Sequence, residues 1–530
     1  MLWEGKGLFG GKWFFMKGEM KMAQIRVDHL TFSYEGSSDP VFEDVSFVLD
    51  TDWKLGFVGR NGKGKTTFLR LLLGQYEYRG KIQASAVFDY FPYRIGENHL
   101  DQMAAEFLEE LKAGCELWRV LVELEKLQAG AEILYRPFGS LSPGERTKIL
   151  LAVLFSGEND FLLIDEPTNH LDEAARECVK EYLASKKGFI LVSHDRELLD
   201  ACIDHVLVLN RCSIQVESGN FSGWWENKSR RDHFQRGENE KHKKEISKLR
   251  QAARQTAGWA DKVEHTKIGF YPGTQHDRPT RAYIGGQTKK MQSRVKSFEK
   301  RIEKEIREKE GLLADLEEDI DLKMMPLAHH KERLVDLREY GVQYAGARQP
   351  VFEGLTAAVF RGDRVALHGP NGCGKSTLLK MLLQKGGVLE ESLPVQETGV
   401  CETASGLVIS YVGQGTSFLK GGLSEFCRKR GLEEHLFFAV LRQLDFEREQ
   451  FGRPLETCSE GQKKKALLAA SLLTPAHLYV WDEPLNYIDV FSRMQIEKVL
   501  LENGPSMVFV EHDKRFRERV ATKVLEMGRM

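Results

Sequence analysis

The sequence predicts an α/β protein in which two tandem copies of one domain are joined by a long α-helical hairpin. Three observations predict this fold: four motifs recur in the same order at a nearly constant offset, strand-like runs alternate with helical patterns in each copy, and this alternation stops between the copies. We expect an N-terminal extension at 1–22, a first domain at 23–222, a linker at 223–328 and a second domain at 329–530.

Composition limits the possible functions. The 530 residues exceed one hydrophobic core, and 76 Lys+Arg against 78 Asp+Glu leave a net charge of -2, so any surface for a polyanion must be local. The 8 Cys include no C-x-x-C pair, which argues against zinc and favours a reducing compartment. No apolar run approaches the roughly 18 residues of a membrane span, and the N-terminus lacks the apolar core of a signal peptide. We therefore expect a soluble cytoplasmic protein, whose natural start is Met1, Met20 or Met22.

The duplication is read directly from the motifs. FEDVS at 42–46 recurs as FEGLT at 352–356, and GRNGKGKT at 59–66 recurs as GPNGCGKS at 369–376, both offset by 310 positions. LIDEPTNHLD at 163–172 recurs as VWDEPLNYID at 480–489, offset by 317. VSHD at 192–195 recurs as VEHD at 510–513, offset by 318. Four motifs in one order, found twice, indicate a duplicated domain.

Each copy has the pattern of a parallel sheet covered by helices. The apolar runs 55–58 and 365–367 lead into glycine-rich loops and then into helical patterns at 67–73 and 377–383. Further buried-strand runs lie at 161–164, 189–192 and 478–481. Strands that alternate with helices in this way are typical of a largely parallel sheet with both faces covered.

The glycine-rich loops match G-x-x-x-x-G-K-[ST] between a strand and a helix, the context that a phosphate-binding loop requires. Backbone N–H groups at a helix N-terminus can then surround the phosphates of ATP. We expect Lys65 and Lys375 to reach the β- and γ-phosphates, and Thr66 and Ser376 to bind Mg²⁺. The predicted ATP-binding loop residues are Gly59, Arg60, Asn61, Gly62, Lys63, Gly64, Lys65, Thr66 and Thr67 in the first copy, and Gly369, Pro370, Asn371, Gly372, Cys373, Gly374, Lys375, Ser376 and Thr377 in the second.

A carboxylate pair follows a buried strand in each copy. Asp165 and Asp482 end apolar runs, where they can hold Mg²⁺, and the adjacent Glu166 and Glu483 can orient or deprotonate the attacking water. A surface pair of acids is the alternative, but the strictly apolar residues before each pair and the proline after it favour catalysis.

The residues between these motifs resemble the signature of the ATP-binding-cassette family, usually written LSGGQ: LSPGE at 141–145 and CSEGQ at 458–462. In that family the signature binds the γ-phosphate held by the opposite cassette, which here implies Ser142, Gly144, Ser459 and Gly461. Neither copy matches fully, since Pro143 removes one N–H and Glu460 adds a carboxylate. These departures could slow hydrolysis.

The same resemblance implies further residues. His194 and His512 stand at the switch histidine, Asp172 and Asp489 at the D-loop, and Gln414 at the Q-loop glutamine that senses Mg²⁺. The first copy has no glutamine there, which leaves Tyr93 as the residue at that place. Tyr34 and Tyr344 each lie 31 residues before a loop lysine, and they could stack on adenine or be buried strand tyrosines.

The linker between the two copies helps to decide which kind of cassette protein this chain is. Apolar residues recur at helical spacing on both sides of the segment 258–286, whose glycines and prolines should interrupt a regular helix, so we expect two long helices with an irregular tip. Residues 241–300 carry 15 Lys/Arg against 5 Asp/Glu. A charged hairpin is often only solvated, but this excess has one sign and is interleaved with aromatic side chains, which favours RNA. The predicted RNA contacts are Lys262, Lys267, Arg278, Arg281, Lys289 and Lys290.

Two cassettes joined by such a linker resemble the ABC-F family of ribosome-associated ATPases, over nearly the whole chain from about Met22. SGNFSGWWENKSRR after the first cassette and GQTKKMQSRVKSFEKRIEKE in the linker look like that family's linker boundaries. The segment TDWKLGFVGRNGKGKTTFLRLL, the stretch FDYFPY and ILYRPFGSLSPGERTKILLAVLF look closest to the Lsa-type antibiotic-resistance branch. The resemblance implies ATP and Mg²⁺, binding at the ribosomal E site to rRNA and P-site tRNA, and protection against lincosamides, pleuromutilins and streptogramin A. It also implies a monomer whose own two cassettes close on each other.

Three alternatives remain open at this point. The first is a housekeeping ABC-F factor that acts on stalled ribosomes without conferring drug resistance. The second is the ATPase subunit of a drug exporter, which would leave the basic linker without a role. The third is a DNA-maintenance ATPase, which is disfavoured because no coiled coil interrupts either cassette and no zinc cysteines are present.

Overall fold

The computed structural model of the chain describes residues 24–35, 40–60, 62–157, 160–169, 171–210, 212–267, 324–389, 393–446 and 448–528, together with helical residues at 293, 295–298, 300–302 and 304–305. The chain forms two compact units: residues 1–221 with 321–530, which hold both cassettes, and residues 222–320. The predicted contacts Arg278, Arg281, Lys289 and Lys290, the loop residue Asn61, and the side chains of Lys262 and Lys267 lie outside what the structure describes.

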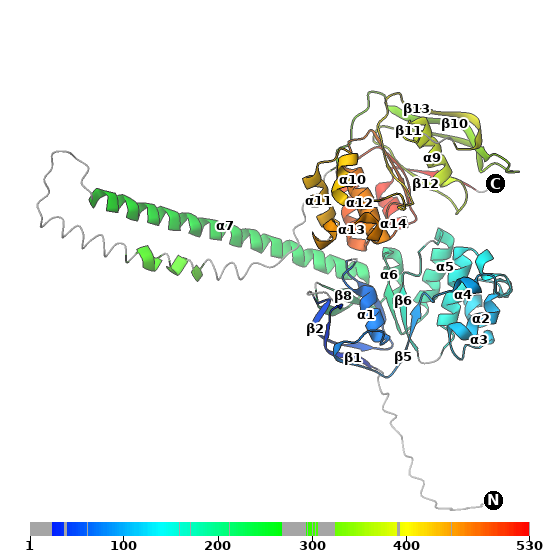
Figure 1. Cartoon of the computed structure of the whole chain (residues 1–530), viewed down its shortest axis with the longest axis horizontal. Helices are drawn as coiled ribbons and strands as arrows, with labels where there is room; N and C mark the ends of the chain where they lie inside the picture. Colours follow the sequence, from blue (N-terminus) through cyan, green and yellow to red (C-terminus); the bar gives the residue numbers. More distant parts are fainter. Residues whose placement is uncertain are drawn as a thin grey trace, which may run out of the picture. The chain divides into compact units, whose positions relative to one another are not determined.

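The first cassette is built on two sheets, coloured blue to cyan-green in Figure 1. A three-stranded antiparallel sheet has the order β2-β1-β4, and a six-stranded sheet has the order β5-β6-β7-β3-β8-β9, in which only the β8–β9 pair is antiparallel. The strands are β1 Gln24–Phe32, β2 Phe42–Asp50, β3 Lys54–Val58, β4 Arg79–Ala84, β5 Val87–Phe91, β6 Asp160–Asp165, β7 Phe189–Val192, β8 His205–Leu209 and β9 Ile214–Ser218. The helices are α1 Lys65–Leu72, α2 Ala104–Leu111, α3 Leu117–Lys126, α4 Pro143–Leu154, α5 Glu173–Ala184 and α6 Arg196–Cys202, with short 3-10 turns at Glu97–His99, Ala131–Tyr135 and Phe138–Ser140.

The second cassette repeats this topology. Its antiparallel sheet has the order β11-β10-β13, and its parallel sheet has the order β14-β15-β16-β12-β17, which matches β5-β6-β7-β3-β8 strand for strand. The strands are β10 Arg333–Tyr344, β11 Phe352–Phe360, β12 Arg364–His368, β13 Val395–Thr403, β14 Ile409–Val412, β15 Leu478–Asp482, β16 Met507–Val510 and β17 Lys523–Glu526. The helices are α9 Lys375–Lys385, α10 Leu423–Lys429, α11 Glu434–Gln443, α12 Glu460–Leu473, α13 Val490–Asn503 and α14 Lys514–Val520, with 3-10 turns at Arg448–Gly452 and Leu455–Thr457. The predicted pair of α/β cassettes is therefore confirmed.

The strands that carry the functional loops are buried on both faces, as continuous apolar sequence requires. All four residues of β7 and of β16 are buried, and so is every residue of β15. In the second cassette Tyr479 and Trp481 point to the α12 side of the sheet, where the Trp481 indole donates a 3.0 Å hydrogen bond to Ser471. This rigid sheet presents the carboxyl end of β15, and with it Asp482, at a fixed place.

The linker begins as one long helix, α7 Phe221–Lys267, drawn as a continuous green ribbon in Figure 1. α7 continues through Gly258 to Lys267, so it covers the start of the segment 258–286 that we expect to be irregular, and the rest of that segment lies outside the described residues. A single internal glycine costs only about 1 kcal/mol relative to alanine, which the surrounding helix-favouring residues offset. The described residues between 293 and 305 are also helical, but the structure does not describe a hairpin.

The stretch 324–328, which the sequence assigned to the linker, lies against the second cassette. Met324 is buried in the core around α12, Pro326 bridges to Ala476, and the Leu327 amide donates a 2.8 Å hydrogen bond to the Ala476 carbonyl. Among the residues that the structure describes, no helix is both long and apolar enough to cross a membrane.

Candidate nucleotide sites

The glycine-rich loops connect β3 to α1 and β12 to α9, as the motif requires. The residue before each helix, Gly64 or Gly374, is in the left-handed region with φ of 109° and 96°. A Cβ on Gly374 would lie 2.6 Å from Val351 and 2.7 Å from Phe352, and one on Gly64 would lie 2.5 Å from Val41. Backbone conformation and close packing therefore both require glycine here.

The loop lysines are folded back onto their own loops. Lys65 Nζ donates to the carbonyls of Gly59 (2.6 Å) and Arg60 (3.2 Å), and Lys375 Nζ donates to those of Gly369 (2.6 Å) and Pro370 (2.9 Å). Burial lowers the pKa of Lys65. Each ammonium group is thus held at the loop, where it is available to a phosphate.

A cavity of about 410 Å³ marks the site of the second cassette. Its lining combines the loop with side chains from the β14, β15 and β16 ends and one residue of the first cassette: Arg176, Tyr344, Val351, Asn371, Gly372, Gly374, Lys375, Ser376, Thr377, Gln414, Glu483, Asn486 and His512. The Tyr344 hydroxyl lies in hydrogen-bond contact with the Thr377 hydroxyl at 3.1 Å, and Tyr34 makes the equivalent 2.6 Å contact with Thr67. Tyr34 is 43% exposed, so it is not a buried strand tyrosine.

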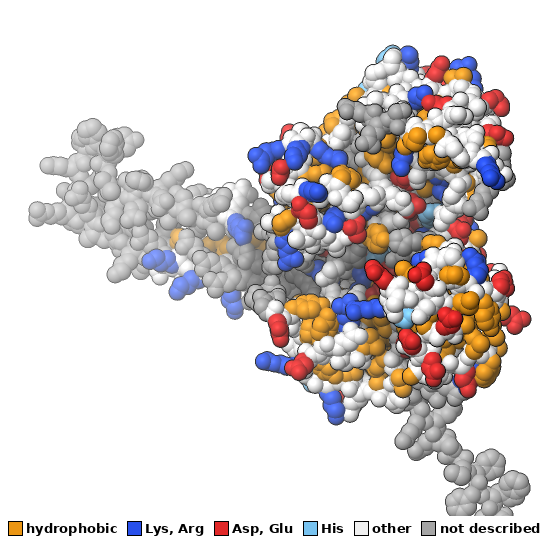
Figure 2. Space-filling model, turned by 45° about the vertical axis from the view of Figure 1, so that its right-hand side comes forward, with side chains coloured by type: hydrophobic (Ala, Val, Ile, Leu, Met, Phe, Trp, Pro, Cys, Tyr) orange, Lys and Arg blue, Asp and Glu red, His pale blue; other side chains and the backbone are white. Residues whose placement is uncertain are grey.

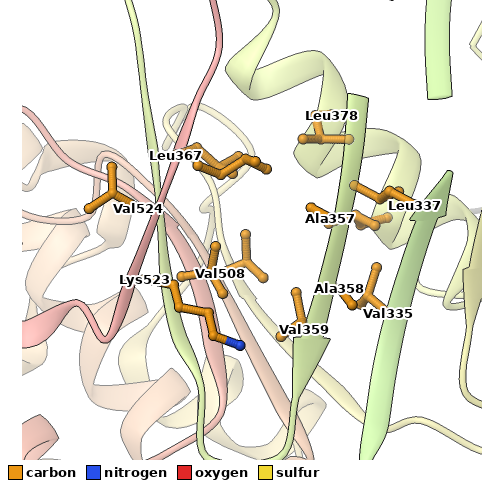
Figure 3. Close-up of a pocket in the computed structure, with 13 residues that line it drawn as sticks. Val335, Leu337, Ala357, Ala358, Val359, Leu367, Leu378, Val508, Lys523 and Val524 are labelled. Carbon is orange, nitrogen blue, oxygen red and sulfur yellow. The ribbon is translucent and has the colours of Figure 1, made fainter. Parts of the chain in front are cut away.

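A separate cavity of about 190 Å³ in the second cassette has a different character (Figure 3). It lies between Val335, Ala357 and Val359 of the antiparallel sheet and Leu367 and Val508 of the parallel sheet, with Lys523 the one charged side chain in its lining. It contains no phosphate-binding loop, so it is not a nucleotide site.

The residues predicted to bind Mg²⁺ form a suitable set. Thr66 Oγ1 donates a 2.9 Å hydrogen bond to Asp165 Oδ2, to which the Tyr90 hydroxyl also donates at 3.1 Å. In the second cassette, Asp482 Oδ1 is buried without a hydrogen-bond partner among the described residues. Burial raises the pKa of both aspartates. A hard cation with oxygen ligands would satisfy the unpartnered oxygen and remove this penalty, so these residues fit Mg²⁺.

Both glutamates that we predict to be catalytic have a left-handed backbone. Glu166 has φ of 52° and Glu483 has φ of 47°, and each amide donates to the neighbouring strand, to Val192 at 2.9 Å and to Val510 at 3.0 Å. Such a conformation costs a non-glycine residue about 1–3 kcal/mol and is typical of functional sites. Glu483 lines the same cavity as Lys375 of the loop.

The side-chain contacts of the two glutamates differ. Glu483 Oε2 accepts hydrogen bonds from Gln414 (2.8 Å) and Asn486 (2.7 Å), and Glu483 Oε1 interacts with His512 Nε2 at 3.2 Å. Burial opposes ionisation of Glu483, but His512, Gln414 and Asn486 outweigh it and lower its pKa to about 2. The Glu483 carboxylate is therefore ionised at neutral pH. Gln414, which we predict to lie near Mg²⁺, donates to this glutamate.

The first site lacks this support. His194 Nε2 lies 3.3 Å from Glu166 Oε1, but the geometry is not that of a hydrogen bond. Glu166 Oε1 is buried, and it has no hydrogen-bond partner in the described part of the chain. Tyr93, at the place of Gln414, donates to Asp89 instead (2.6 Å). Burial, reinforced by Asp165, raises the pKa of Glu166 to about 8, and burial lowers that of His194.

The signature serines cap their own helices. Ser142 begins α4 and Ser459 begins α12, each in a capping box with Glu145 or Gln462. Pro143 occupies the first helical position, where the missing N–H would have no partner within the helix. Glu460 contacts Thr416 and lies 3.2 Å from Lys463, so its carboxylate is held within its own cassette.

The remaining predicted residues lie near the same places. Asp172 and Asp489 cap α5 and α13 through hydrogen bonds from Ala175 and Ser492. A Cβ on Gly461 would lie 2.7 Å from the Tyr487 carbonyl, which brings the signature of the second cassette against its D-loop. The Arg60 side chain pairs with Asp445 at 3.1 Å, and its carbonyl accepts the hydrogen bond from Lys65.

Sequence reasoning missed several residues of these sites. Asn486 follows Glu483 by three positions, as Asn169 follows Glu166, and this repeat was a usable signal. Lys464 is buried and donates to the carbonyls of Gly413 (2.8 Å) and Glu483 (3.2 Å), a role that no motif indicates. Arg176, which reaches the site of the other cassette, was also missed.

Comparison with known proteins decides the family. The ABC transporter family model matches residues 42–169 and 352–486, one match per cassette. The Ribosome protection protein VmlR of Bacillus subtilis (strain 168) is 27% identical over 93% of this chain and 85% of its own length. ABC transporter F family member 2 of Arabidopsis thaliana is 24% identical over 95% of this chain and 76% of its own length. The chain belongs to the ABC-F family. It is an ATP-hydrolysing enzyme with two cassettes.

Structural similarity supports the same fold for this ABC-F protein. A chain from the crystal structure of archaeal ribosomal stalk protein aP1 with archaeal ribosome recycling factor aABCE1 superposes with a TM-score of 0.58. It is 19% identical, and the match covers 94% of this chain and 87% of that one, so the likeness concerns the fold alone.

A Nuclease-related domain model also matches residues 172–272. These residues include β7, which pairs between β6 and β3 inside the ATPase sheet, and they run on into α7. The match therefore crosses two parts of the ABC-F architecture and does not outline a separate folded domain.

Proposed function

We propose that this ABC-F ATPase binds the ribosome through residues 223–328 and protects the peptidyl-transferase centre from lincosamides, pleuromutilins and streptogramin A. The observation that carries the proposal is the similarity to a ribosome protection protein across 93% of the chain, both cassettes and linker included. In this proposal the linker enters the E site beside the P-site tRNA, and the chain acts as a monomer in the cytoplasm.

The shape and charge of the linker support a nucleic-acid partner. A helix of 47 residues is about 70 Å long. The residues of 241–300 carry a threefold excess of basic over acidic side chains. On the face of the cassettes shown in Figure 2, by contrast, basic and acidic side chains are intermixed. A polyanion would therefore be attracted to the linker rather than to this face.

In this proposal, ATP binding and hydrolysis at the two nucleotide sites control when the protein binds the ribosome and when it leaves. Lys65 and Lys375 bind the phosphates, Thr66, Asp165, Ser376 and Asp482 hold Mg²⁺, and closure brings each signature helix to the opposite loop. Glu483, already ionised, orients and deprotonates the attacking water in its site. We propose that closure stabilises the ribosome-bound state and that hydrolysis releases the protein.

Drug-susceptibility testing checks this proposal. Expression of the chain in a susceptible bacterium should raise the inhibitory concentrations of lincosamides, pleuromutilins and streptogramin A, but not that of a drug that acts on another target. The matched control is the Glu166→Gln/Glu483→Gln double variant, which should confer no protection because it cannot complete the cycle. Unchanged susceptibility, with ribosome binding intact, would reject protection and leave the housekeeping ABC-F alternative.

A further inference from the structure

An arginine recurs in the two cassettes at the same place, and neither copy belongs to a recognised nucleotide motif. Arg176 stands four residues after Asp172, and Arg493 stands four residues after Asp489. Both therefore lie in the first turn of the helix that the D-loop aspartate caps, α5 or α13.

Equivalent contacts hold the two guanidinium groups. The Nε atom of Arg176 donates to the Leu171 carbonyl at 3.0 Å, and that of Arg493 donates to the Ile488 carbonyl at 2.9 Å. A terminal nitrogen lies 4.0 Å from Asp195 in the first cassette and 3.3 Å from Asp513 in the second. The side chains are only 15% and 9% exposed. Each arginine is thus fixed by its own cassette.

Each arginine also lies close to the other cassette. Arg176 lines the nucleotide cavity of the second cassette together with Lys375, Glu483 and His512. Arg493 lies one helical turn before Glu497 on α13, and Glu497 accepts a 2.7 Å hydrogen bond from Arg196 of the first cassette, two residues after His194. Each arginine therefore lies where its cassette meets the opposite one.

We propose that Arg176 and Arg493 act in trans, each contacting the terminal phosphate of the nucleotide in the opposite cassette. In hydrolysis the water oxygen bonds to the γ-phosphorus, its proton passes to the glutamate, and the bond from the γ-phosphorus to the bridging oxygen breaks, with its electron pair leaving on ADP. The arginine transfers no proton. Its planar, permanently charged guanidinium stabilises the negative charge on the phosphoryl oxygens in the transition state.

This arrangement would couple hydrolysis to closure. An arginine that belongs to the opposite cassette reaches the phosphate only when the two cassettes are together. The Asp195 and Asp513 carboxylates hold the guanidinium groups in place for that contact. The inference rests on the ATPase activity of the chain, not on ribosome binding.

The two sites can be measured one at a time in the full-length protein without ribosomes, by replacing the glutamate of the other site with glutamine. With Glu166→Gln, only the second site retains its glutamate, and Arg176→Ala should lower phosphate release at least about tenfold, while Arg493→Ala changes it less than twofold. With Glu483→Gln the pattern should reverse. A loss of equal size in both backgrounds would show that the arginines only support the fold, and no loss in either would also overturn the proposal.

Where ATP turnover of a variant is too low to compare, the binding of a transition-state analogue can be measured instead. ADP with aluminium fluoride mimics the transferred phosphoryl group, and the wild-type protein should bind two equivalents tightly, whereas Arg176→Ala should retain one. Arg176→Lys keeps the charge without the planar fork and should show the same site specificity with a smaller loss, which carries the test if the alanine variant does not fold. Two tight equivalents in both Arg176 variants would overturn the proposal.

Discussion

At the scale of single residues, Glu166 and Glu483 show how neighbours decide the chemistry of one motif. Both follow an aspartate at the end of a buried strand, and both have a left-handed backbone. Glu483 interacts with three side chains and has a pKa of about 2, whereas Glu166 lacks such support and has a pKa of about 8. The same Asp-Glu motif therefore has different protonation in the two cassettes.

The pH dependence of stability should reveal this difference in the nucleotide-free, Mg²⁺-free protein. The raised pKa of Glu166 means that the native state keeps a proton that the unfolded state loses, so Glu166 costs stability increasingly from about pH 4.5 to 8. Glu166→Gln should raise the apparent Tm, and its advantage should grow from pH 5 to pH 8.

The Glu483→Gln variant is the matched control. The lowered pKa of Glu483 stabilises the native state above about pH 4.5, and this contribution is lost only as the pH falls toward 2. Glu483→Gln should therefore lower the apparent Tm by a similar amount throughout pH 5 to 8. Parallel curves for the two variants in thermal unfolding would contradict the assignment.

At the scale of elements, the signature helices show what motif recognition leaves out. The sequence predicts where the signature lies. The structure adds that the hydroxyl groups of Ser142 and Ser459 cap their own helices. A phosphate that binds here would compete with the cap for the same helix N-terminus. The two predicted signature serines therefore already have a structural role.

Removal of the cap should have a measurable cost. Ser142→Ala deletes the hydroxyl that accepts from the Glu145 amide at 3.2 Å, and we expect a loss of about 1 kcal/mol in the free energy of unfolding. Chemical denaturation of the nucleotide-free protein measures this. Ser142→Thr, which retains a capping hydroxyl, should cost less, and equal losses in the two variants would show that the cap is not the cause.

The elements also show how far sequence predicts structure. The loops, the buried strands and the duplicated order were predictable because each is encoded locally, by glycines beside an apolar run or by a repeated spacing. The helix through Gly258 was not, because one glycine is a small cost in a long helix. The reach of Arg176 into the second site was not predictable either, since it depends on packing between cassettes that are far apart in sequence.

At the scale of the whole molecule, buried charge joins the cassettes. Arg196 of the first cassette donates a 2.7 Å hydrogen bond to Glu497 of the second, and the two side chains are 1% and 3% exposed. Arg519 also lies 2.7 Å from Glu497, and Arg517 bonds Glu173 at 3.1 Å. Polar contacts of this kind specify how two surfaces meet, but they add little net stability.

Removing one partner of the Arg196–Glu497 pair should destabilise the protein more per residue than removing both partners. Arg196→Ala leaves Glu497 buried with Arg519 alone, and we expect a loss of about 3 kcal/mol in the free energy of unfolding. The Arg196→Ala/Glu497→Ala double variant should lose clearly less than the sum of the single variants. Chemical denaturation of the four proteins measures the coupling, and additive losses would contradict it.

Ribosome co-sedimentation of the Glu166→Gln/Glu483→Gln variant tests the central claim most directly. The two cassettes should still close on ATP but not hydrolyse it, so the variant should pellet with ribosomes in the presence of ATP and not of ADP. Replacing Lys262, Lys267, Arg278 and Arg281 by glutamine should weaken pelleting and its salt dependence without changing ATP turnover of the otherwise wild-type chain. ATP-independent pelleting, no pelleting, or wild-type turnover of the double variant would contradict a ribosome-bound ATPase clamp.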